Sequence, residues 1–390
     1  MNPLHICFLC NEYPPGPHGG IGTMTQVLAR ALVQARHQVR VAGLYAHSYP
    51  APDYEEDQGV CVWRLRQPAH RLSWVSARHK LFRTIARWSR QGEIDLVEVP
   101  DWEGLAAGWP RLPVPVIARL NGAMSYFASE LGQPVRRAPF WLERASLRRA
   151  DFWCSVSRYT ADKTQRLFGL RSGPRAILYN PVDVPSDLCV NTRSSSQVIF
   201  TGTLTAKKGI VSLAKAWPHV IEVCKDAELH IYGKDGRTDE GPSMQAFILS
   251  QYNGQVAKSV HFHGHVERTE LFATLQKARL AVFPSYAEAF AIAPLEAMAY
   301  GCPTIYSQRG SGPELIEDGR DGLLIEPDQP DEIAEAIIRV LTDDSLAQRL
   351  GEAGRERVMR NFSAQILLAQ NEAFYQDCLR DFRHNPSGDS

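Results

Sequence analysis

The sequence predicts an α/β protein built from two doubly wound domains. Short apolar runs alternate with amphipathic stretches along the chain, a pattern typical of parallel strands joined by crossover helices. The 390 residues exceed one ordinary domain, so two are expected. A polar stretch separates two such series. The expected division is therefore an N-terminal domain at 1–184, a linker at 185–196, a C-terminal domain at 197–364, a last helix at 365–382 and a disordered tail at 383–390.

The apolar runs give the expected strands of each series. Those of the first series are His5–Cys10, Gln38–Gly43, Leu96–Val99, Val114–Leu120, Phe152–Val156 and Ala176–Tyr179, with a helix at Gly22–Gln34. Those of the second are Val198–Thr201, Glu228–Tyr232, Val260–His263, Leu280–Phe283, Thr304–Tyr306 and Leu323–Ile325, with helices at Ile210–Val223, Arg268–Ala278, Asp331–Leu341, Ser345–Arg360 and Ala364–Arg380. Such sheets bind ligands at the carboxyl ends of their strands.

Composition excludes several classes of protein. Lysine plus arginine balance aspartate plus glutamate at 43 each, which argues against a general nucleic-acid binder. No apolar run approaches the ~20 residues of a membrane span, and the first residues lack the basic region of a secretory signal. The eight cysteines are scattered, and Cys7 and Cys10 fit a buried strand better than a metal site or a disulfide. A cytoplasmic protein is therefore expected.

Two carboxylates stand eight positions apart where a strand runs into a helix. Glu288 follows the apolar run Leu280–Phe283 in a loop, and Glu296 lies just inside a helix whose first turn holds Pro294. A helix N-terminus carries free amides and partial positive charge, which suit a phosphorylated ligand. Two acids at that place bind hydroxyl groups while the amides bind phosphate, which suits a nucleotide sugar.

Two further features fit an anionic ligand. Gly19, Gly20 and Gly22 lie between the first strand and its helix, where glycine lets the backbone approach a ligand closely. A flexible turn is the alternative reading of these glycines. Lys208 stands just before the helix at Ile210–Val223, where an ammonium group neutralises a diphosphate as its charge develops. A solvated lysine is the alternative there.

These motifs resemble the family 4 retaining glycosyltransferases of the GT-B fold, whose hallmark is Glu, seven residues, Glu. Further family motifs follow one another in the family's order over nearly the whole chain. They are Glu12-Tyr-Pro-Pro, Gly19-Gly-Ile-Gly22, Val156-Ser157, Asn180-Pro-Val-Asp183, Gly202-Thr-Leu-Thr-Ala-Lys-Lys-Gly209, Ile231-Tyr-Gly-Lys-Asp-Gly236, Phe262-His-Gly-His265, Phe283-Pro-Ser285, Gly310-Ser-Gly-Pro-Glu314 and Asp321-Gly-Leu-Leu-Ile325. The resemblance implies two facing Rossmann-like domains, an interdomain cleft and a last helix that crosses back to the first domain.

The resemblance also implies a function. It is the transfer of a hexosyl unit with retained configuration, from a nucleotide diphosphate sugar (a UDP-sugar is favoured) to a hydroxyl group. The acceptor would be a glycan or a lipid-linked glycan in polysaccharide or cell-envelope biosynthesis. No Asp-x-Asp occurs in the chain, so neither a metal nor another cofactor is expected. A catalytically impaired nucleotide-sugar-binding or scaffold protein on the same fold is the alternative.

By the same resemblance, Lys208, Glu288 and Asn121 are the candidate catalytic residues. Glu296 would bind the ribose and Glu288 the transferred sugar. The remaining donor-binding candidates are Gly19, Gly20, Gly22, Thr203, Ser285, Ala289, Phe290 and Ala291. Two positions depart from the family: Thr203 replaces its usual arginine, and Asn121 stands where many relatives have a histidine. Asn121 forms hydrogen bonds but is no base near neutral pH.

The acceptor is expected to bind the first domain, at His18, Asp101, Trp102 and Tyr126. Asp101 and Trp102 also fit a plain helix start. A basic, partly amphipathic stretch carries Arg136, Arg137, Arg144, Arg148 and Arg149. It fits peripheral contact with an anionic membrane, which would place the protein on the inner face of the cell membrane. A solvated charged face is the alternative.

Overall fold

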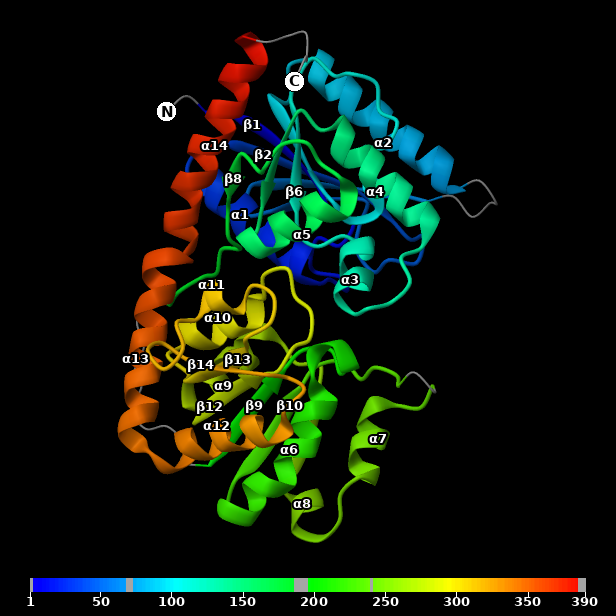
Figure 1. Ribbon diagram of the computed structural model, residues 1–390. Coiled ribbons are helices and arrows are strands. Elements are labelled where there is room, and N and C mark those ends of the chain that lie inside the picture. The colour runs from blue at the N-terminus through cyan, green and yellow to red at the C-terminus, as the bar shows by residue number, and fades with distance from the viewer. Residues whose placement is uncertain (1–2, 68–72, 186–195, 239–240, 385–390) are drawn as a thin grey trace. The chain divides into compact units, whose positions relative to one another are not determined.

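The computed structural model describes residues 3–67, 73–185, 196–238 and 241–384. The chain divides into two compact units (Figure 1). Unit 1 comprises Met1–Pro181 with Ala364–Ser390, and unit 2 comprises Val182–Ser363. Most of the expected linker at 185–196, and residues 385–390 of the expected tail, lie outside the described residues. Residues 383 and 384, assigned to that tail, instead end a helix that runs to His384.

Unit 1 contains an eight-stranded sheet among its described residues, in the order β3-β4-β2-β1-β5-β6-β7-β8. All its pairings are parallel except that of β3 with β4. The strands are β1 His5–Leu9, β2 Gln38–Tyr45, β3 Tyr54–Asp57, β4 Val60–Arg66, β5 Leu96–Pro100, β6 Val116–Leu120, β7 Phe152–Ser155 and β8 Ala176–Ile177. Its helices are α1 Gly20–Gln34, α2 Ser73–Arg90, α3 Met124–Glu130, α4 Arg137–Arg149, α5 Arg158–Phe168 and α14 Ala364–His384.

The hairpin of β3 and β4 was not expected from the sequence. Gln58 and Gly59 form its turn, both at positive φ, as a two-residue hairpin of type I′ requires. Val60 and Val62 are buried, and the residues that follow each of them, Cys61 and Trp63, are partly exposed. This alternation over β4 was the sequence signal for a strand.

A buried network fixes α14 to the sheet of unit 1. Arg119 of β6 pairs with Glu98 of β5 through Nε–Oε1 and Nη2–Oε2 contacts of 2.6 and 3.0 Å. From α14, the Tyr375 hydroxyl donates to Glu98 over 2.7 Å, and the Asn371 amide oxygen accepts from Arg119 over 2.5 Å. All four side chains are buried. The last helix therefore belongs to unit 1 although it follows unit 2 in the chain, which confirms the expected crossover.

Unit 2 contains a six-stranded parallel sheet in its described part, in the order β11-β10-β9-β12-β13-β14. Counted from β9, this is the order 3-2-1-4-5-6 of the Rossmann fold. The strands are β9 Gln197–Thr201, β10 Glu228–Tyr232, β11 Val260–Gly264, β12 Leu280–Phe283, β13 Thr304–Ser307 and β14 Leu323–Ile325. The helices are α6 Ile210–Val223, α7 Met244–Ser250, α8 Gly254–Lys258, α9 Arg268–Lys277, α10 Ile292–Ala299, α11 Gly312–Leu315, α12 Pro330–Thr342 and α13 Asp344–Asn361.

Helices cover both faces of the unit 2 sheet. On one face, α6 and α12 pack together over the alternate apolar residues of the strands, and fully buried Trp217 of α6 donates to Ser259 over 2.9 Å. On the other, α10 contacts β12 and β13 and packs against α9 and α13. This leaves the carboxyl ends of the strands to the loops, as expected for a doubly wound sheet.

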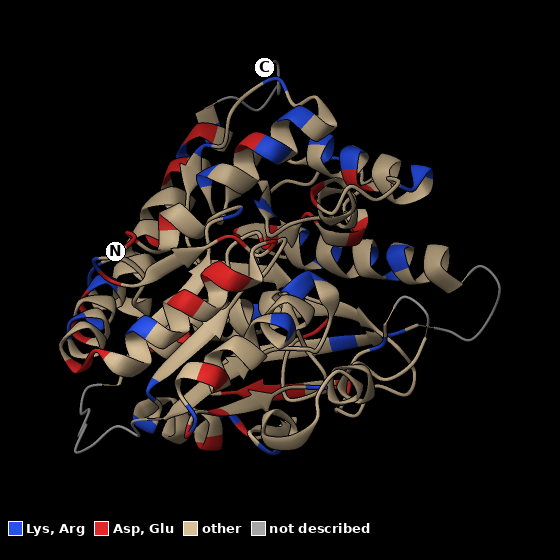
Figure 2. Ribbon diagram, turned by 60° about the horizontal axis from the view of Figure 1, so that its bottom comes forward, with Lys and Arg blue, Asp and Glu red and all other residues tan. Residues whose placement is uncertain are grey.

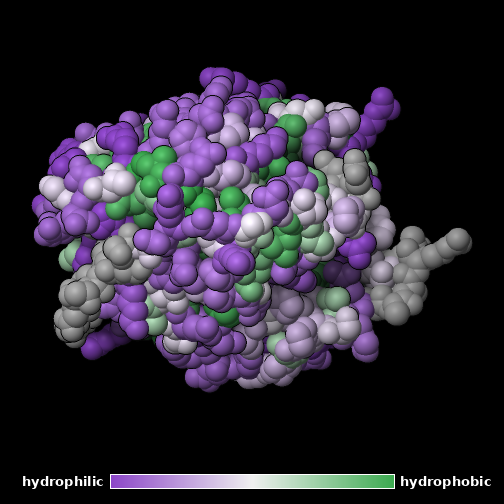
Figure 3. Space-filling view, turned by 90° about the horizontal axis from the view of Figure 1, so that it is seen from below, coloured by the Kyte–Doolittle hydropathy of each residue, from purple (hydrophilic) through white to green (hydrophobic). Residues whose placement is uncertain are grey.

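Among the described residues, none of the helices combines the length and the apolar character that crossing a membrane requires. The face shown in Figure 3 is mostly hydrophilic, with apolar side chains gathered in small patches. Lysine and arginine stand out on α2, which carries no acidic residue (Figure 2).

Candidate functional site

Two loops of unit 2 begin where the strand order reverses. In the sheet, β9 lies beside β12, and β10 lies on the other side of β9, so the chain winds in opposite directions from this point. Open α/β sheets bind ligands outside the carboxyl ends of their strands at such a switch point. The loop after β9 brings Lys208 there and the loop after β12 brings Glu288. The Lys208 Nζ lies 2.5 Å from the Glu288 Oε1.

The backbone around Lys208 requires a glycine. Residues Ala206–Lys208 form a 3-10 turn, and Gly209 follows at φ 73° before α6 begins. A Cβ on Gly209 would lie 1.7 Å from the Pro284 carbonyl oxygen, so no other residue fits between the two loops. The Tyr286 amide also donates to the Lys207 carbonyl over 2.8 Å. The loops after β9 and β12 are thus packed backbone against backbone.

The electrostatics of this pair favour a charged glutamate. Burial acts to raise the pKa of Glu288, but the positive charges of Lys208 and Lys207 and the hydrogen bonds from Lys208 and Ser285 outweigh it and hold the pKa below its ordinary value. Burial lowers the pKa of Lys207, against the opposing charge of Glu288. The side chains of Lys208 and Glu288 are 29% and 12% exposed, so both remain accessible to a ligand.

Glu296 has a cationic partner that the sequence did not indicate. It lies within α10 and forms an ion pair with Arg268, the first residue of α9. The Arg268 guanidinium also lies 5.2 Å from the ring centroid of Phe272. Burial raises the pKa of Glu296; Arg268 opposes this and Asp183 adds to it. Arg268 comes from a different segment, so no local pattern identified it.

The N-terminus of α10 has no side-chain cap. Ala291 is its N-cap and has no side-chain capping hydrogen bond, which leaves amides of the first turn as donors. Ala289, Phe290 and Ala291 are buried and contribute backbone rather than exposed side chains. Ser285 is buried and hydrogen-bonds to Glu288, whereas Thr203 is exposed. The structure thus brings Lys208, Ser285 and Glu288 together.

In unit 1, the glycine loop leads into α1 and is braced by Glu12. Glu12 Oε1 accepts from the Gly22 amide over 2.9 Å, and a Cβ on Gly22 would lie 2.1 Å from the Glu12 carbonyl oxygen. Gly19 and Gly20 are exposed, as is His18, whose Nδ1 lies 2.8 Å from the Gly16 carbonyl. Glu12 belongs to a motif quoted above, but its role as a brace needed the structure.

Asp101 supports the loop that carries Asn121. Its carboxylate is 1% exposed and accepts the backbone amides of Asn121 and Gly122 over 2.9 and 3.2 Å. Trp102 is partly exposed, while Tyr126 is buried with its hydroxyl 3.4 Å from the Thr160 Oγ1. Asp101 therefore positions Asn121 from the interior and offers no surface to an acceptor in this conformation.

Next to Asp101, Glu103 adopts a strained backbone. Its φ is 59°, uncommon for a residue other than glycine, and its side chain accepts from Asn11 over 3.0 Å. Arg78 of α2 donates to the Glu103 and Gly104 carbonyls. Asn11 follows β1 and Glu103 follows β5, which are neighbours where the strand order of this sheet reverses. Glu103 belongs to the Asp101-Trp102-Glu103 segment that sequence reasoning considered for the acceptor, whereas Asn11 was not among the site candidates.

The buried Asp101 gives a prediction for pH dependence. Burial raises its pKa to about 7 from the usual 3.8, so folding takes up a proton between these values. Its contribution to stability is therefore fully present below pH 3.8 and is lost as pH rises through about 7. Relative to Asp101→Asn, the native chain should lose up to ~1.4 kcal/mol per pH unit across this window.

Urea unfolding at a series of pH values measures this difference. The exposed Asp162→Asn variant on α5 is the matched control and should keep the native slope. If the free energies of unfolding of the native chain and of Asp101→Asn changed in parallel with pH, Asp101 would be ionised across this whole pH window.

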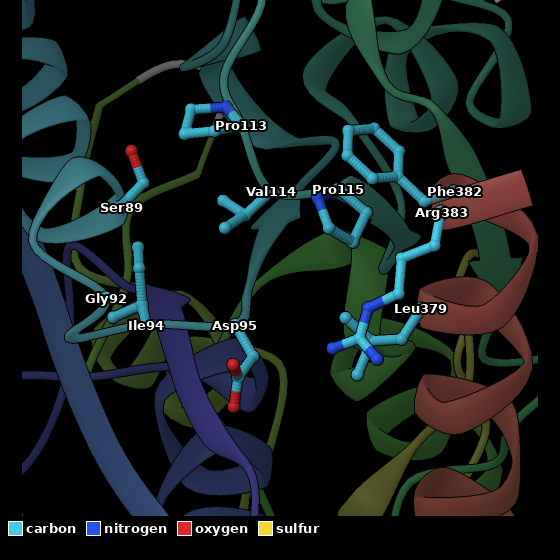
Figure 4. Close-up of a pocket in the computed structure, with 10 residues that line it drawn as sticks. All are labelled: Ser89, Gly92, Ile94, Asp95, Pro113, Val114, Pro115, Leu379, Phe382 and Arg383. Atoms are coloured by element: carbon cyan, nitrogen blue, oxygen red, sulfur yellow. The ribbon is translucent and has the colours of Figure 1, made fainter. Parts of the chain in front are cut away.

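A small pocket lies at the amino ends of the strands of the unit 1 sheet (Figure 4). Its volume is about 210 Å³, and Asp95 and Val114 line it just before β5 and β6 begin, with Leu379 and Phe382 of α14 opposite. This is the amino end of the strands, away from the edge where doubly wound sheets bind ligands. We do not assign it to the functional site.

The basic stretch forms α4, and part of its charge is used internally. Arg144 donates to the Phe168 carbonyl and lies 5.2 Å from the Trp141 ring centroid, and Arg149 donates to the Trp109 and Pro110 carbonyls. The other three arginines predicted to contact a membrane are exposed, namely Arg136, Arg137 and Arg148.

Comparison with known families shows which family of proteins the chain resembles. Residues 18–185 match the family described as Glycosyltransferase Family 4, and residues 192–357 match the family described as Glycosyl transferases group 1. The protein is a family 4-like glycosyltransferase of the GT-B type. The GT-B fold expected from the sequence is thereby confirmed.

Relatives of this glycosyltransferase align over nearly its full length. It is 26% identical to a glycogen synthase of Mycobacterium tuberculosis, over 95% of this chain and 94% of that one. It is 27% identical to a GDP-mannose-dependent alpha-(1-6)-phosphatidylinositol monomannoside mannosyltransferase of the same species, over 94% and 96%. The fold matches sucrose-phosphate synthase from Thermosynechococcus elongatus with a TM-score of 0.79 at 20% identity, over 96% of this chain and 99% of that one.

Proposed function

We propose that this glycosyltransferase transfers a hexosyl unit from a nucleotide diphosphate sugar to a hydroxyl group with retained anomeric configuration. The observation that carries the proposal is the Lys208–Glu288 pair, which joins the loops after β9 and β12 at the switch point of unit 2. A cation and a helix N-terminus without a side-chain cap suit a diphosphate, and two carboxylates suit hydroxyl groups. A nucleotide sugar presents both kinds of group.

Each residue of this site has a proposed role. The Lys208 ammonium and the amides at the start of α10 bind the diphosphate and stabilise it as it leaves. Glu288, kept charged by the two lysines, accepts hydrogen bonds from the transferred sugar. Glu296 accepts hydrogen bonds from the ribose, and Arg268 holds it when no donor is bound. This assigns charge neutralisation to protein groups and needs no metal.

The chemistry needs little from a protein base. The bond from the anomeric carbon to the phosphate oxygen breaks as the acceptor oxygen attacks from the same face. The departing phosphate oxygen takes the acceptor proton, so the carboxylates stabilise charge rather than abstract a proton. Asn121, held in place by Asp101, is proposed as a hydrogen-bonding group for the sugar.

For the donor and the acceptor, we propose chemical classes rather than single compounds. A UDP-sugar remains the favoured donor, and the GDP-mannose named for one relative makes a GDP-sugar the second candidate. The acceptor is proposed to be a glycan or a lipid-linked glycan, bound by loops at the carboxyl edge of the unit 1 sheet. The exposed Arg136, Arg137 and Arg148 would serve peripheral contact with an anionic membrane on its cytoplasmic face.

A donor panel tests the binding part of this proposal. UDP-, GDP- and ADP-sugars are compared by thermal shift on the native chain, on Glu296→Ala and on the exposed control Glu335→Ala of α12. One donor class should raise the melting temperature of the native chain and of the control. The shift should disappear in Glu296→Ala, because the ribose loses its acceptor. If Glu296→Ala responds like the native chain, the ribose does not bind at α10. Tight binding without any turnover would instead favour the scaffold alternative.

A further inference from the structure

A cluster of histidines lies on one face of the unit 2 sheet, away from the donor loops. Leu229 and Ile231 point into the core under α6, so the alternation of β10 places Glu228 and His230 on the opposite face. His261 pairs with His230 in the parallel register of β10 and β11. The edge strand β11 therefore adds its histidine to the same face.

The spacing of these side chains suits a metal ion. Glu228, His230 and His261 each offer one ligand atom, and these atoms all lie within 4.8 Å of one another. The Glu228 Oε2 and the His230 Nε2 are 3.3 Å apart. Bonds of about 2.0–2.1 Å at tetrahedral angles place two ligand atoms about 3.3–3.4 Å apart. This pair therefore already has the required spacing, and the ligand atom of His261 lies within 4.8 Å of both.

Two further observations distinguish this cluster from a chance gathering of surface residues. The His230 Nδ1 lies 2.9 Å from the His263 Nε2, and the two rings stack at 5.1 Å. Histidines that bind a metal commonly use their other ring nitrogen for a hydrogen bond that fixes the ring, as here. Within the described part of the chain, the His261 Nε2 is buried and has no hydrogen-bond partner. A buried polar atom of this kind is costly unless something binds it.

We propose that Glu228, His230 and His261 bind a divalent transition-metal ion, with Zn²⁺ the first candidate. Two imidazoles and a carboxylate suit Zn²⁺, Ni²⁺ or Cu²⁺ rather than Mg²⁺, and a water molecule completes the coordination. Because Glu228 stands at the amino end of β10, the ion lies at the end of the strand opposite to the donor loops. It clamps the edge strand β11 to β10 and stabilises unit 2 without entering the transfer reaction.

Calorimetric titration of the full chain without a polyhistidine tag tests this site. The native chain should bind about one equivalent of Zn²⁺ and should not respond to Mg²⁺ at the same concentration. His230→Ala and Glu228→Gln should each weaken Zn²⁺ binding by at least about 10-fold, since even groups outside the ligand set cost about 10–100-fold. The exposed His219→Ala variant of α6 is the matched control and should bind like the native chain.

Thermal unfolding gives a second readout that is independent of transfer activity. Zn²⁺ should raise the melting temperature of the native chain and of His219→Ala, and should leave that of His230→Ala unchanged. Glu228 is exposed, so Glu228→Gln keeps the test valid if the histidine variant folds poorly. Equal Zn²⁺ affinity in the native chain, His230→Ala and Glu228→Gln would overturn the proposal, and so would a native chain that binds no Zn²⁺.

Discussion

Replacing Lys208 with alanine should lower the turnover number for sugar transfer by about 10²–10³-fold, the loss expected when one preorganised donor to a developing anion is removed. Lys208 forms the ion pair with Glu288. The neighbouring Lys207 accepts a hydrogen bond at its backbone carbonyl from the Tyr286 amide in the loop after β12. The exposed Lys215→Ala variant of α6 changes the same charge away from the site and should keep native turnover.

A second variant separates this loss from misfolding. Lys208→Ala alone leaves Glu288 without its closest cation, because their atoms lie 2.5 Å apart, so the pKa of Glu288 should rise and the unit should lose stability. The double variant Lys208→Met with Glu288→Gln removes both charges and should recover most of that stability while remaining slow. If the double variant regained native turnover, the pair would be structural and the leaving-group role of Lys208 would be wrong.

Replacing Arg119 with methionine should destabilise unit 1 by about 3–5 kcal/mol, because it leaves the buried Glu98 carboxylate without its ion partner. The loss should also loosen α14, since Asn371 and Tyr375 hydrogen-bond to the same pair. Calorimetry is the suitable measurement, because the two units need not unfold together. A single unfolding midpoint would merge the transitions of the two units.

The double variant Glu98→Gln with Arg119→Met tests whether the cost comes from the unpaired charge. Glutamine is neutral and still accepts from Tyr375, so part of the lost stability should return. The exposed Arg90→Met variant of α2 should unfold like the native chain. A change below about 1 kcal/mol in Arg119→Met would mean that water reaches Glu98 and that the network does not fix α14.

Much of the fold could be predicted because its signals are local. The strands of unit 2 are short segments with apolar residues in succession or in alternation, and each falls within a residue or two of its expected position. The β3–β4 hairpin was missed because β3 is Tyr-Glu-Glu-Asp, a polar edge strand whose pairing partner supplies the stability. The shorter β8, Ala176–Ile177, likewise ends where its partner β7 ends.

The site could be predicted only in part, and for a related reason. Glu288 and Glu296 share one local motif, and Lys208 precedes a recognisable helix, so sequence reasoning selected all three. Arg268 is distant in sequence from Glu296, and its place on that carboxylate depends on α9 packing against α10. The brace from Glu12 to the glycine loop is likewise a tertiary contact. Their roles in transfer remain predictions that the variants above address.

The most direct test follows the released sugar by proton NMR, using the donor that stabilises the native chain and no acceptor other than water. The proposal predicts slow hydrolysis in which the first sugar formed has the same anomeric configuration as the donor, and a rate about 10²–10³-fold lower in Lys208→Ala. Release of the opposite anomer would contradict a retaining mechanism. Equal rates in the native chain and Lys208→Ala would contradict the site at the switch point of unit 2.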